Sequence, residues 1–224
     1  MKAIVVGNGP SLSKETLNFI NENREDCIHF GVNRINILYD ETSWRPDIWV
    51  IADRSNSTHY SQDIQRNLEE GIECYVRADI PRGAEALMWQ GNYPFTFRLY
   101  PECDHVDCNK NPATEWHEPF CKYGGSLFVA IQHACSDRHE LSEVCLIGCD
   151  GNYRAHSYNN FVQNYVHIDA HSAEIARTIN ETQAQAHKIA KREAAKRGIR
   201  IYNATRGSAF TMHPYISLED FLLT

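Results

Sequence analysis

The sequence predicts an α/β fold in which helices cover both faces of a mostly parallel β-sheet. Short apolar runs typical of buried strands alternate along the chain with longer segments typical of helices, which is the pattern of a parallel sheet. Glycine, asparagine and aspartate follow several of the apolar runs, and such sheets bind ligands at the carboxyl ends of their strands. The 224 residues suffice for one domain that buries its core without disulfide or metal staples.

Most of the predicted strands are short apolar runs that stop at a polar or glycine residue. We expect strands at Lys2–Val6, Cys27–Val32, Pro46–Ala52, Ile72–Val76, Phe95–Tyr100, Val144–Gly148 and Ile199–Asn203. Most of the predicted helices follow a serine or threonine that can cap them, and glycines such as Gly71 and Gly198 end two of them. We expect helices from Ser11 or Ser13 to about Asn21, and at Thr58–Glu70, Ser126–Cys135, Ser172–Arg197 and Ser217–Leu223.

These elements predict a single Rossmann-like domain over residues 1–224. Residues 81–122 interrupt the pattern, because they hold five of the eight prolines and show little periodicity. We interpret this stretch as a long irregular insertion or a lid, since long loops in a compact domain tend to be functional.

Composition excludes several functional classes. The net charge is −7 and no basic face is concentrated in the sequence, so we expect no binding of nucleic acid. No apolar run reaches the roughly 18 residues of a membrane helix, and Gly7 follows the first apolar run too soon for a signal peptide. We interpret the eight cysteines as free thiols in a reducing cytoplasm.

The loop Gly7-Asn8-Gly9-Pro10-Ser11-Leu12 after the first strand is the strongest local signal. Two glycines allow backbone N–H groups to approach a ligand, and the positive end of the following helix favours phosphate. The loop lacks the third glycine of a dinucleotide fingerprint and the Gly-Lys-Ser/Thr of a Walker loop. A tight strand-to-helix turn without a ligand explains these six residues equally well.

Several motifs in order resemble one related group of proteins. Val-Val-Gly-Asn-Gly-Pro-Ser-Leu, Gly-Val-Asn-Arg and Arg-Pro-Asp-Ile-Trp-Val-Ile-Ala-Asp are followed later by Tyr-Gly-Gly-Ser-Leu-Phe, Ile-Gly-Cys-Asp-Gly-Asn-Tyr, His-Ile-Asp-Ala and Ile-Tyr-Asn-Ala-Thr-Arg-Gly. This order is similar to that of the bacterial sialyltransferases of the Campylobacter type. It also resembles a broad set described as 6-hydroxymethylpterin diphosphokinase-like or flagellin-glycosylation accessory proteins. The resemblance covers about residues 1–55 and 120–208.

The resemblance implies a nucleotide site made of three loops. In the sialyltransferases the first loop holds the phosphate and ribose of a CMP-sugar, which points to Asn8, Gly9 and Ser11 with their neighbours Gly7 and Pro10. The asparagine after the second strand of those enzymes matches Asn33. Their small-residue loop that contacts the nucleotide base matches Gly124-Gly125-Ser126. We add Asp150 and Tyr153, which follow a later strand, and expect tyrosine hydroxyls of this loop, including Tyr158 and Tyr165, as partners for a leaving phosphate.

Asp53 departs from the sialyltransferase pattern, which has asparagine at the end of the third strand. A carboxylate near a donor phosphate repels it unless a cation or a sugar hydroxyl lies between them. Asp53 therefore favours a ribose hydroxyl or a metal over direct phosphate contact.

The catalytic base implied by the resemblance is a histidine before the long helix. His167 matches the pterin-kinase-like set and His171 the sialyltransferases, and Asp169 could orient the ring of His167. Histidine suits this role because its ordinary pKa, about 6.5, allows it to accept a hydroxyl proton near neutral pH. Either residue could equally be a surface histidine of the loop.

Three functions follow from these residues. The first is a glycosyltransferase that takes a nucleotide-sugar donor and a small-molecule or glycan acceptor and requires no cofactor. The second is a pterin diphosphokinase that binds ATP and magnesium, with Asp53, Asp150 and Asp169 as candidate ligands. The third is a non-catalytic nucleotide- or sugar-binding accessory protein of glycan assembly. The sequence leaves the oligomeric state open.

A zinc site in the insertion is less expected than unpaired thiols. The candidate ligands are Cys103, His105, Cys108, His117 and Cys121. Structural zinc prefers cysteine and histidine pairs spaced by two to four residues, and no Cys-x-x-Cys pair is present here.

Overall fold

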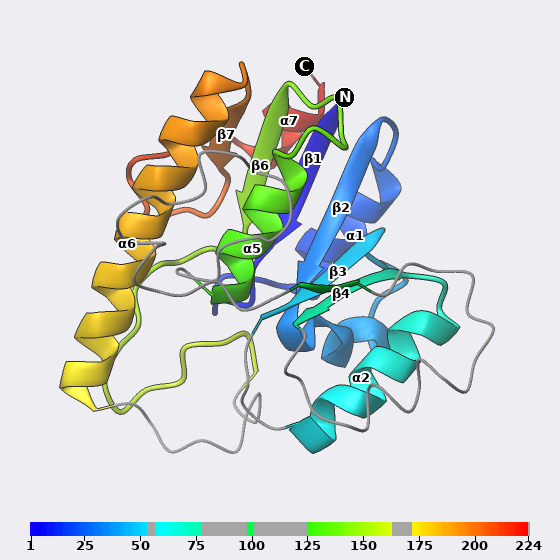
Figure 1. Ribbon diagram of the computed structural model, residues 1–224, viewed down its shortest axis with the longest axis horizontal. Helices are drawn as coiled ribbons and strands as arrows, with labels where there is room; N and C mark the ends of the chain where they lie inside the picture. Colours follow the sequence, from blue (N-terminus) through cyan, green and yellow to red (C-terminus); the bar gives the residue numbers. More distant parts are fainter. Residues whose placement is uncertain (53–56, 78–97, 101–124, 163–171, 224) are drawn as a thin grey trace.

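The computed structural model describes residues 1–52, 57–77, 98–100, 125–162 and 172–223. They form a seven-stranded sheet whose strand order is β5-β4-β3-β2-β1-β6-β7. All the strands run parallel. The predicted α/β fold with a parallel sheet and helices on both faces is therefore confirmed (Figure 1).

The strands lie within a few residues of their predicted positions. They are β1 (Lys2–Val6), β2 (Cys27–Val32), β3 (Ile48–Ile51), β4 (Glu73–Arg77), β5 (Arg98–Tyr100), β6 (Glu143–Ile147) and β7 (Arg200–Asn203). Of the predicted insertion 81–122, the described residues include only those of β5, which pairs with β4. The rest of the insertion, with its candidate zinc ligands, lies outside the described residues.

The helices also agree with the prediction, with one addition. They are α1 (Lys14–Glu22), α2 (Ser57–Glu69), α5 (Gly125–Ala134), α6 (Ala173–Lys196) and α7 (Leu218–Leu223). Ser13 caps α1 and Ser172 caps α6, each by accepting a backbone N–H of the first turn. The addition is η1 (Asn33–Asp40), a 3-10 helix that directly follows β2 and that the sequence pattern did not predict.

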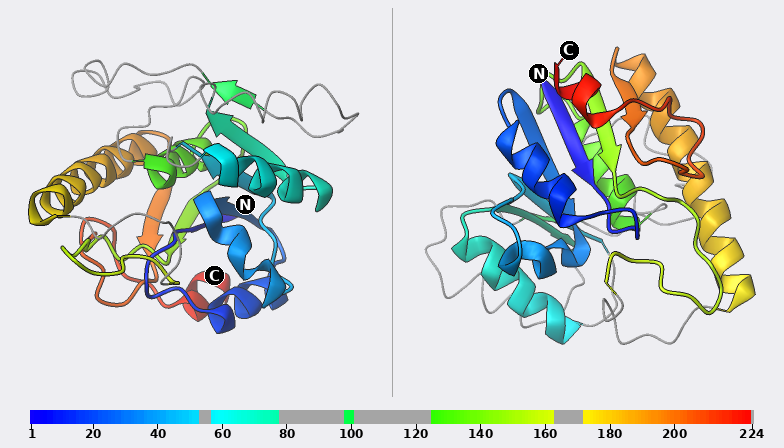
Figure 2. Two further views of the ribbon diagram at one scale, coloured as in Figure 1. Left: turned by 90° about the horizontal axis from the view of Figure 1, so that it is seen from below. Right: turned by 180° about the vertical axis from the view of Figure 1, so that it is seen from behind.

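Each face of the sheet carries its own hydrophobic core. Along β1, Ala3 and Val5 belong to the core beneath α5 and α6, whereas Ile4 and Val6 belong to the core on the opposite face. This alternation follows from the two-residue period of a strand. The opposite face is covered by α1, η1, α2 and α7, and Figure 2 shows both faces. No helix in the described part of the chain is long and apolar enough to cross a membrane.

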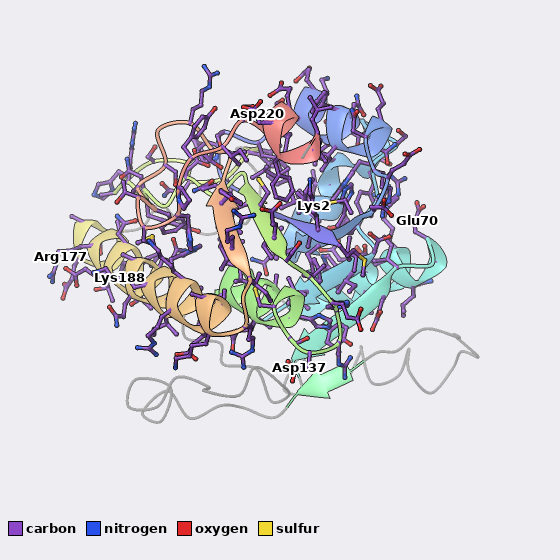
Figure 3. All side chains as sticks on the ribbon, turned by 90° about the horizontal axis from the view of Figure 1, so that it is seen from above. Lys2, Glu70, Asp137, Arg177, Lys188 and Asp220 are labelled. Atoms are coloured by element: carbon purple, nitrogen blue, oxygen red, sulfur yellow. The ribbon has the colours of Figure 1, made fainter. Side chains whose placement is uncertain are left out.

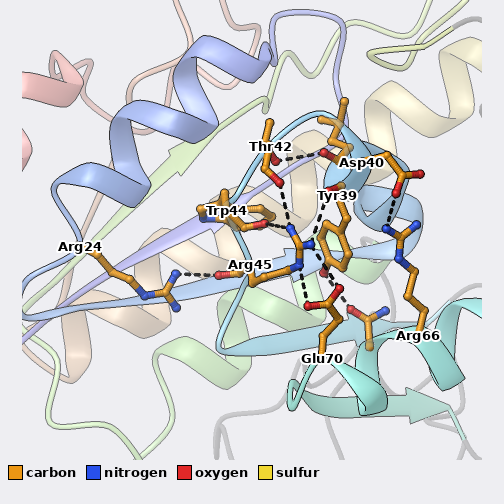
Figure 4. A network of polar contacts seen from close by, with 10 residues as sticks. Arg24, Tyr39, Asp40, Thr42, Trp44, Arg45, Arg66 and Glu70 are labelled. Carbon is orange, nitrogen blue, oxygen red and sulfur yellow. Dashed lines mark hydrogen bonds and ion pairs between the residues drawn. The ribbon is translucent and has the colours of Figure 1, made fainter.

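Arg45 connects η1 to neighbouring segments through hydrogen bonds and an ion pair (Figure 4). Its guanidinium donates to the carbonyl oxygens of Thr42 and Trp44 at 3.0 and 2.9 Å, and lies over the ring of Tyr39. The same group pairs with Glu70 just after α2, with Nε 3.1 Å from Oε2 and Nη2 3.2 Å from Oε1. This ion pair, with its one hydrogen bond from Nη2, holds η1 against the end of α2.

His29 is completely buried in β2 on the α1 side of the sheet. The indole N–H of Trp44 donates to its Nδ1 at 3.0 Å, so Nδ1 is an acceptor and the ring is neutral. Burial lowers the pKa of His29 to about 4, with Arg24 adding to the effect and Asp47 opposing it. The described cysteines, Cys27, Cys74, Cys135, Cys145 and Cys149, are buried free thiols.

Candidate functional site

The strand order places a topological switch point between β1 and β6. From β1 the chain proceeds to β2 on one side, while β6, much later in the sequence, pairs with β1 on the other side. Ligands of open parallel sheets bind outside the carboxyl ends of the strands at such a point. The loops at this position are residues 7–13 after β1 and 148–153 after β6.

These two loops touch through glycines. The N–H of Gly7 donates to Ile147 O and that of Gly9 to Gly148 O, both at 2.8 Å. A Cβ on Gly9 would lie 1.9 Å from Oδ2 of Asp150 and 2.7 Å from Gly148 O, which is too close for any other residue. Neither Gly7 nor Gly9 has a positive φ, so these positions need glycine for close packing rather than for an unusual backbone conformation.

Asp150 lies against the first loop. Its Oδ2 accepts the hydroxyl proton of Ser11 at 2.8 Å and the N–H of Ser11 at 3.4 Å. The hydroxyl group that we expected to contact a phosphate therefore donates to a carboxylate. The positive end of α1 is also partly satisfied, because the Ser13 hydroxyl accepts from Thr16 N and Glu15 lies in the first turn. A hydroxyl or a cation suits this position better than a bare phosphate.

Asn8 connects the first loop to two other segments. Its side-chain Nδ2 donates to Val32 O at 2.8 Å, and its backbone carbonyl oxygen accepts the N–H of Phe161 at 3.0 Å. Val32 directly precedes Asn33, whose φ of 49° is left-handed and whose carbonyl accepts the indole N–H of Trp49 at 2.6 Å. Asn8 and the turn at Asn33 are thus brought together at the carboxyl ends of β1 and β2.

Gly125 and Ser126 begin α5 beside the end of β3. The Ser126 hydroxyl accepts the N–H of Ala52 at 2.8 Å and is almost fully buried, which gives it a structural role. Gly125 has a φ of 76°, and among the described residues none lies within 4 Å of where a Cβ would be. Gly124, which precedes Gly125, and Asp53, which follows Ala52, lie outside the described part of the chain.

Tyr153 is held by the long helix. Asn180 of α6 accepts the N–H of Tyr153 at 2.7 Å and donates to its carbonyl at 2.9 Å. Asn180 was not among the predicted site residues, although an amide in a helix opposite an irregular loop is a suitable partner for loop backbone. Tyr158 in the same loop is 65% exposed.

The predicted catalytic histidines lie outside the described residues. His167, His171, Asp169 and Tyr165 all fall within residues 163–171. Their assignment therefore stays a prediction. In the described part of the chain, no group of three or more histidine, cysteine, aspartate or glutamate residues is placed to hold a metal ion.

A third loop supports the other two. Cys149 O accepts from the Ser208 hydroxyl at 2.6 Å and Cys149 N donates to the Thr205 hydroxyl at 3.0 Å. The N–H of Ala209 donates to Asp150 O at 2.8 Å. The chain after β7 therefore fixes the backbone of Asp150, and with it the carboxylate that contacts Ser11.

The fold and this edge of the sheet define a Rossmann-like α/β protein. No protein-family model matches the chain, and no curated protein matches it. Twelve chains of solved structures do match. One of them is the MAf glycosyltransferase from Magnetospirillum magneticum AMB-1, with a TM-score of 0.57 and 13% sequence identity. The match covers 96% of this chain and 33% of that one, so this chain spans one third of the length of the glycosyltransferase whose fold it shares.

Proposed function

We propose that the chain is a glycosyltransferase of the sialyltransferase-like kind, and that its nucleotide-sugar donor binds where the loops after β1 and β6 meet. The observation that carries the proposal is the convergence of Asn8, Ser11 and Asp150 at the switch point of the sheet. The motif order of the sequence and the fold shared with a glycosyltransferase support the same reading.

Asp150 refines the expected pose of the donor. A carboxylate accepts hydrogen bonds from hydroxyl groups, so the Asp150 side of the first loop suits a ribose or sugar hydroxyl. The donor phosphate then lies away from Asp150, towards Asn8 and the glycine at the start of α5. No described residue lies within 4 Å of a Cβ built on Gly125, and the N-terminus of α5 favours negative charge.

The transfer itself uses a histidine base in this proposal. His167 or His171 takes the proton of the acceptor hydroxyl, and the oxygen attacks the anomeric carbon of the donor. The new carbon–oxygen bond forms as the bond from that carbon to the donor phosphate breaks. The nucleotide phosphate leaves with the electron pair.

Asp150 also supports a second candidate function, that of a pterin diphosphokinase-like enzyme. A carboxylate oxygen in the candidate site is a ligand type that magnesium prefers. A kinase of this kind would bind ATP only together with the metal ion.

A thermal-shift panel separates the candidates. Nucleotides and sugar nucleotides are added with and without magnesium, because a ligand that binds the native state raises the melting temperature. Stabilisation by CMP or CMP-sugars without magnesium supports the transferase, and magnesium-dependent stabilisation by ATP supports the kinase. Absence of any shift with every nucleotide contradicts both and leaves a sugar-binding accessory protein.

An Asn8→Ala variant tests the site itself. We expect it to weaken nucleotide binding about tenfold while the protein stays folded, since one hydrogen bond to a charged group is lost. Asn23→Ala is the matched control, because Asn23 also donates to a backbone carbonyl, that of Phe19, but at the end of α1 remote from the first loop. Equal nucleotide affinity in folded Asn8→Ala and wild-type protein would reject the assignment.

A further inference from the structure

The segment from β7 to α7 closes on itself as a compact loop. Asn203 N donates to Pro214 O at 3.0 Å and Ile216 N donates to Asn203 O at 3.4 Å, so the two ends of the loop lie side by side. Figure 2 shows this loop in orange-red beside α6. Compact surface loops with close ends are frequently functional.

The loop lines an open pocket of about 460 Å³. This volume lies within the range of roughly 300–1,000 Å³ typical of small-molecule sites. The inner wall is rigid, because Asn203 and Ser208 hydrogen-bond to each other and to Cys149 O. Phe210 is buried and stacks on His187, so it supports the wall from behind. The pocket is therefore built on fixed backbone rather than on a loose turn.

Two polar side chains meet on the exposed side of the pocket. Nε of Arg206 donates to the hydroxyl oxygen of Tyr215 at 3.1 Å. The two Nη groups of Arg206 make no ion pair within 4.0 Å with any described carboxylate, and Glu219 acts on the charge only from a distance. The Tyr215 hydroxyl accepts from Arg206 and so retains its own proton for donation. Arginine Nη groups and a phenol proton together form a receptor for an oxyanion.

A buried histidine lies deeper in the wall. His213 is 3% exposed, and its Nε2 is 2.9 Å from Nδ1 of His187. Its own Nδ1 is buried and has no hydrogen-bond partner. Because this nitrogen has almost no accessible surface, His213 supports the pocket wall rather than contacting a molecule in the pocket. Burial lowers the pKa of His213 to about 4, with Lys191 adding to the effect, so the ring is neutral at pH 7.

We propose that this pocket is a second binding site, which takes a small ligand carrying one carboxylate or phosphate group, as a sugar acid or a sugar phosphate does. Arg206 and Tyr215 bind the anionic group at the mouth, above a wall that the buried pair His187 and His213 supports. This proposal does not depend on the proposed glycosyl transfer, because none of these residues belongs to the nucleotide site.

Isothermal titration with three sugars tests the proposal. The probes are D-glucuronate, D-glucose 6-phosphate and neutral D-glucose, each added to the full chain. We expect at least one anionic sugar to bind at least tenfold more tightly than glucose, since hydrogen bonds to charged groups are the stronger ones. A preference for glucuronate identifies the ligand as a sugar acid, and a preference for glucose 6-phosphate identifies it as a sugar phosphate. Equal affinity for all three probes, or binding of none, overturns the proposal.

Variants locate the binding. Arg206→Gln should weaken binding of the preferred anionic sugar about tenfold or more, and Tyr215→Phe, which removes only one hydroxyl, several-fold. Arg177→Gln is the control, because Arg177 is an exposed arginine of α6 (Figure 3) whose loss removes the same charge elsewhere. Unchanged binding in folded Arg206→Gln, or an equal loss in Arg177→Gln, overturns the assignment. Nucleotide binding should be unaffected by Arg206→Gln, so this result separates the two sites.

Discussion

Replacement of Gly9 by alanine should destabilise the protein through a contact between two loops. The added Cβ would lie 1.9 Å from Oδ2 of Asp150 and 2.7 Å from the carbonyl oxygen of Gly148. The Asp150 side chain can rotate away at the loss of its bonds to Ser11, but the Gly148 carbonyl belongs to backbone that is fixed by other hydrogen bonds. Forced overpacking of this kind costs about 1–3 kcal/mol.

The assay is urea unfolding followed by circular dichroism, together with a thermal melt. We expect Gly9→Ala to lower the free energy of unfolding by about 2 kcal/mol, which corresponds to a melting temperature lower by roughly 4–8 °C in a chain of this length. Gly198→Ala is a suitable comparison, because Gly198 has a φ of 72° but no neighbour within 4 Å of a Cβ in the part of the chain that the structure describes. That variant reports the cost of a left-handed conformation alone, about 1 kcal/mol.

A double-mutant cycle separates the two clashes. In an Asp150→Ala background the 1.9 Å contact is absent, so Gly9→Ala should cost about 1 kcal/mol less, while the contact with Gly148 O keeps the cost above zero. Stability of Gly9→Ala within 0.5 kcal/mol of wild type would refute the reasoning. Close packing would then not explain the glycine at position 9, and only a role in ligand binding would remain.

Three further predictions concern stability and turnover. Burial depresses the pKa of His29 and of His213 to about 4, so each ring stays neutral in the folded protein at pH 7. The stabilisation that each neutral ring contributes is therefore complete above about pH 6.5, and it falls by up to about 3 kcal/mol as the pH drops towards 4. Urea midpoints that do not change between pH 7.5 and 5 would contradict this. Arg45→Met should cost about 2 kcal/mol in urea unfolding, since the ion pair and two carbonyl contacts are lost, and a cost below 0.5 kcal/mol would show that η1 does not need this anchor. His167→Ala should retain nucleotide affinity and lose turnover about 10²–10⁴-fold, whereas His171→Ala should lose much less. The reverse order of the two losses would make His171 the base, and unchanged turnover in both variants would exclude a histidine base.

The sequence was sufficient to predict most of the regular structure, because buried strands of a parallel sheet are short apolar runs with clear ends. Ile48–Ile51 and Glu143–Ile147 are examples, and Ser13 and Ser172 marked helix starts correctly. The 3-10 helix at Asn33–Asp40 was missed because a tight three-residue turn has no 3.6-residue apolar period.

The contacts within the candidate site were harder to predict. Placement of Asn8 near Asn33 follows from adjacent strands, so the sequence could suggest it. The bond from Ser11 to Asp150 joins residues 139 apart and depends on β1 pairing with β6, which no local pattern reveals. For the same reason, the role of Gly9 in packing against Gly148 could not be separated from a role in ligand binding.

The central position of β1 has a consequence for how the chain folds. β1 pairs with β2 only about 25 residues later, but Val6 meets its other partner, Ile147, only after 141 residues. During synthesis, β1 to β5 can therefore assemble while one edge of β1 remains unpaired. An exposed apolar edge of this kind is a template for association between nascent chains. Pairing across so long a separation is also slow, so the arrival of β6 is the step at which correct folding and aggregation compete.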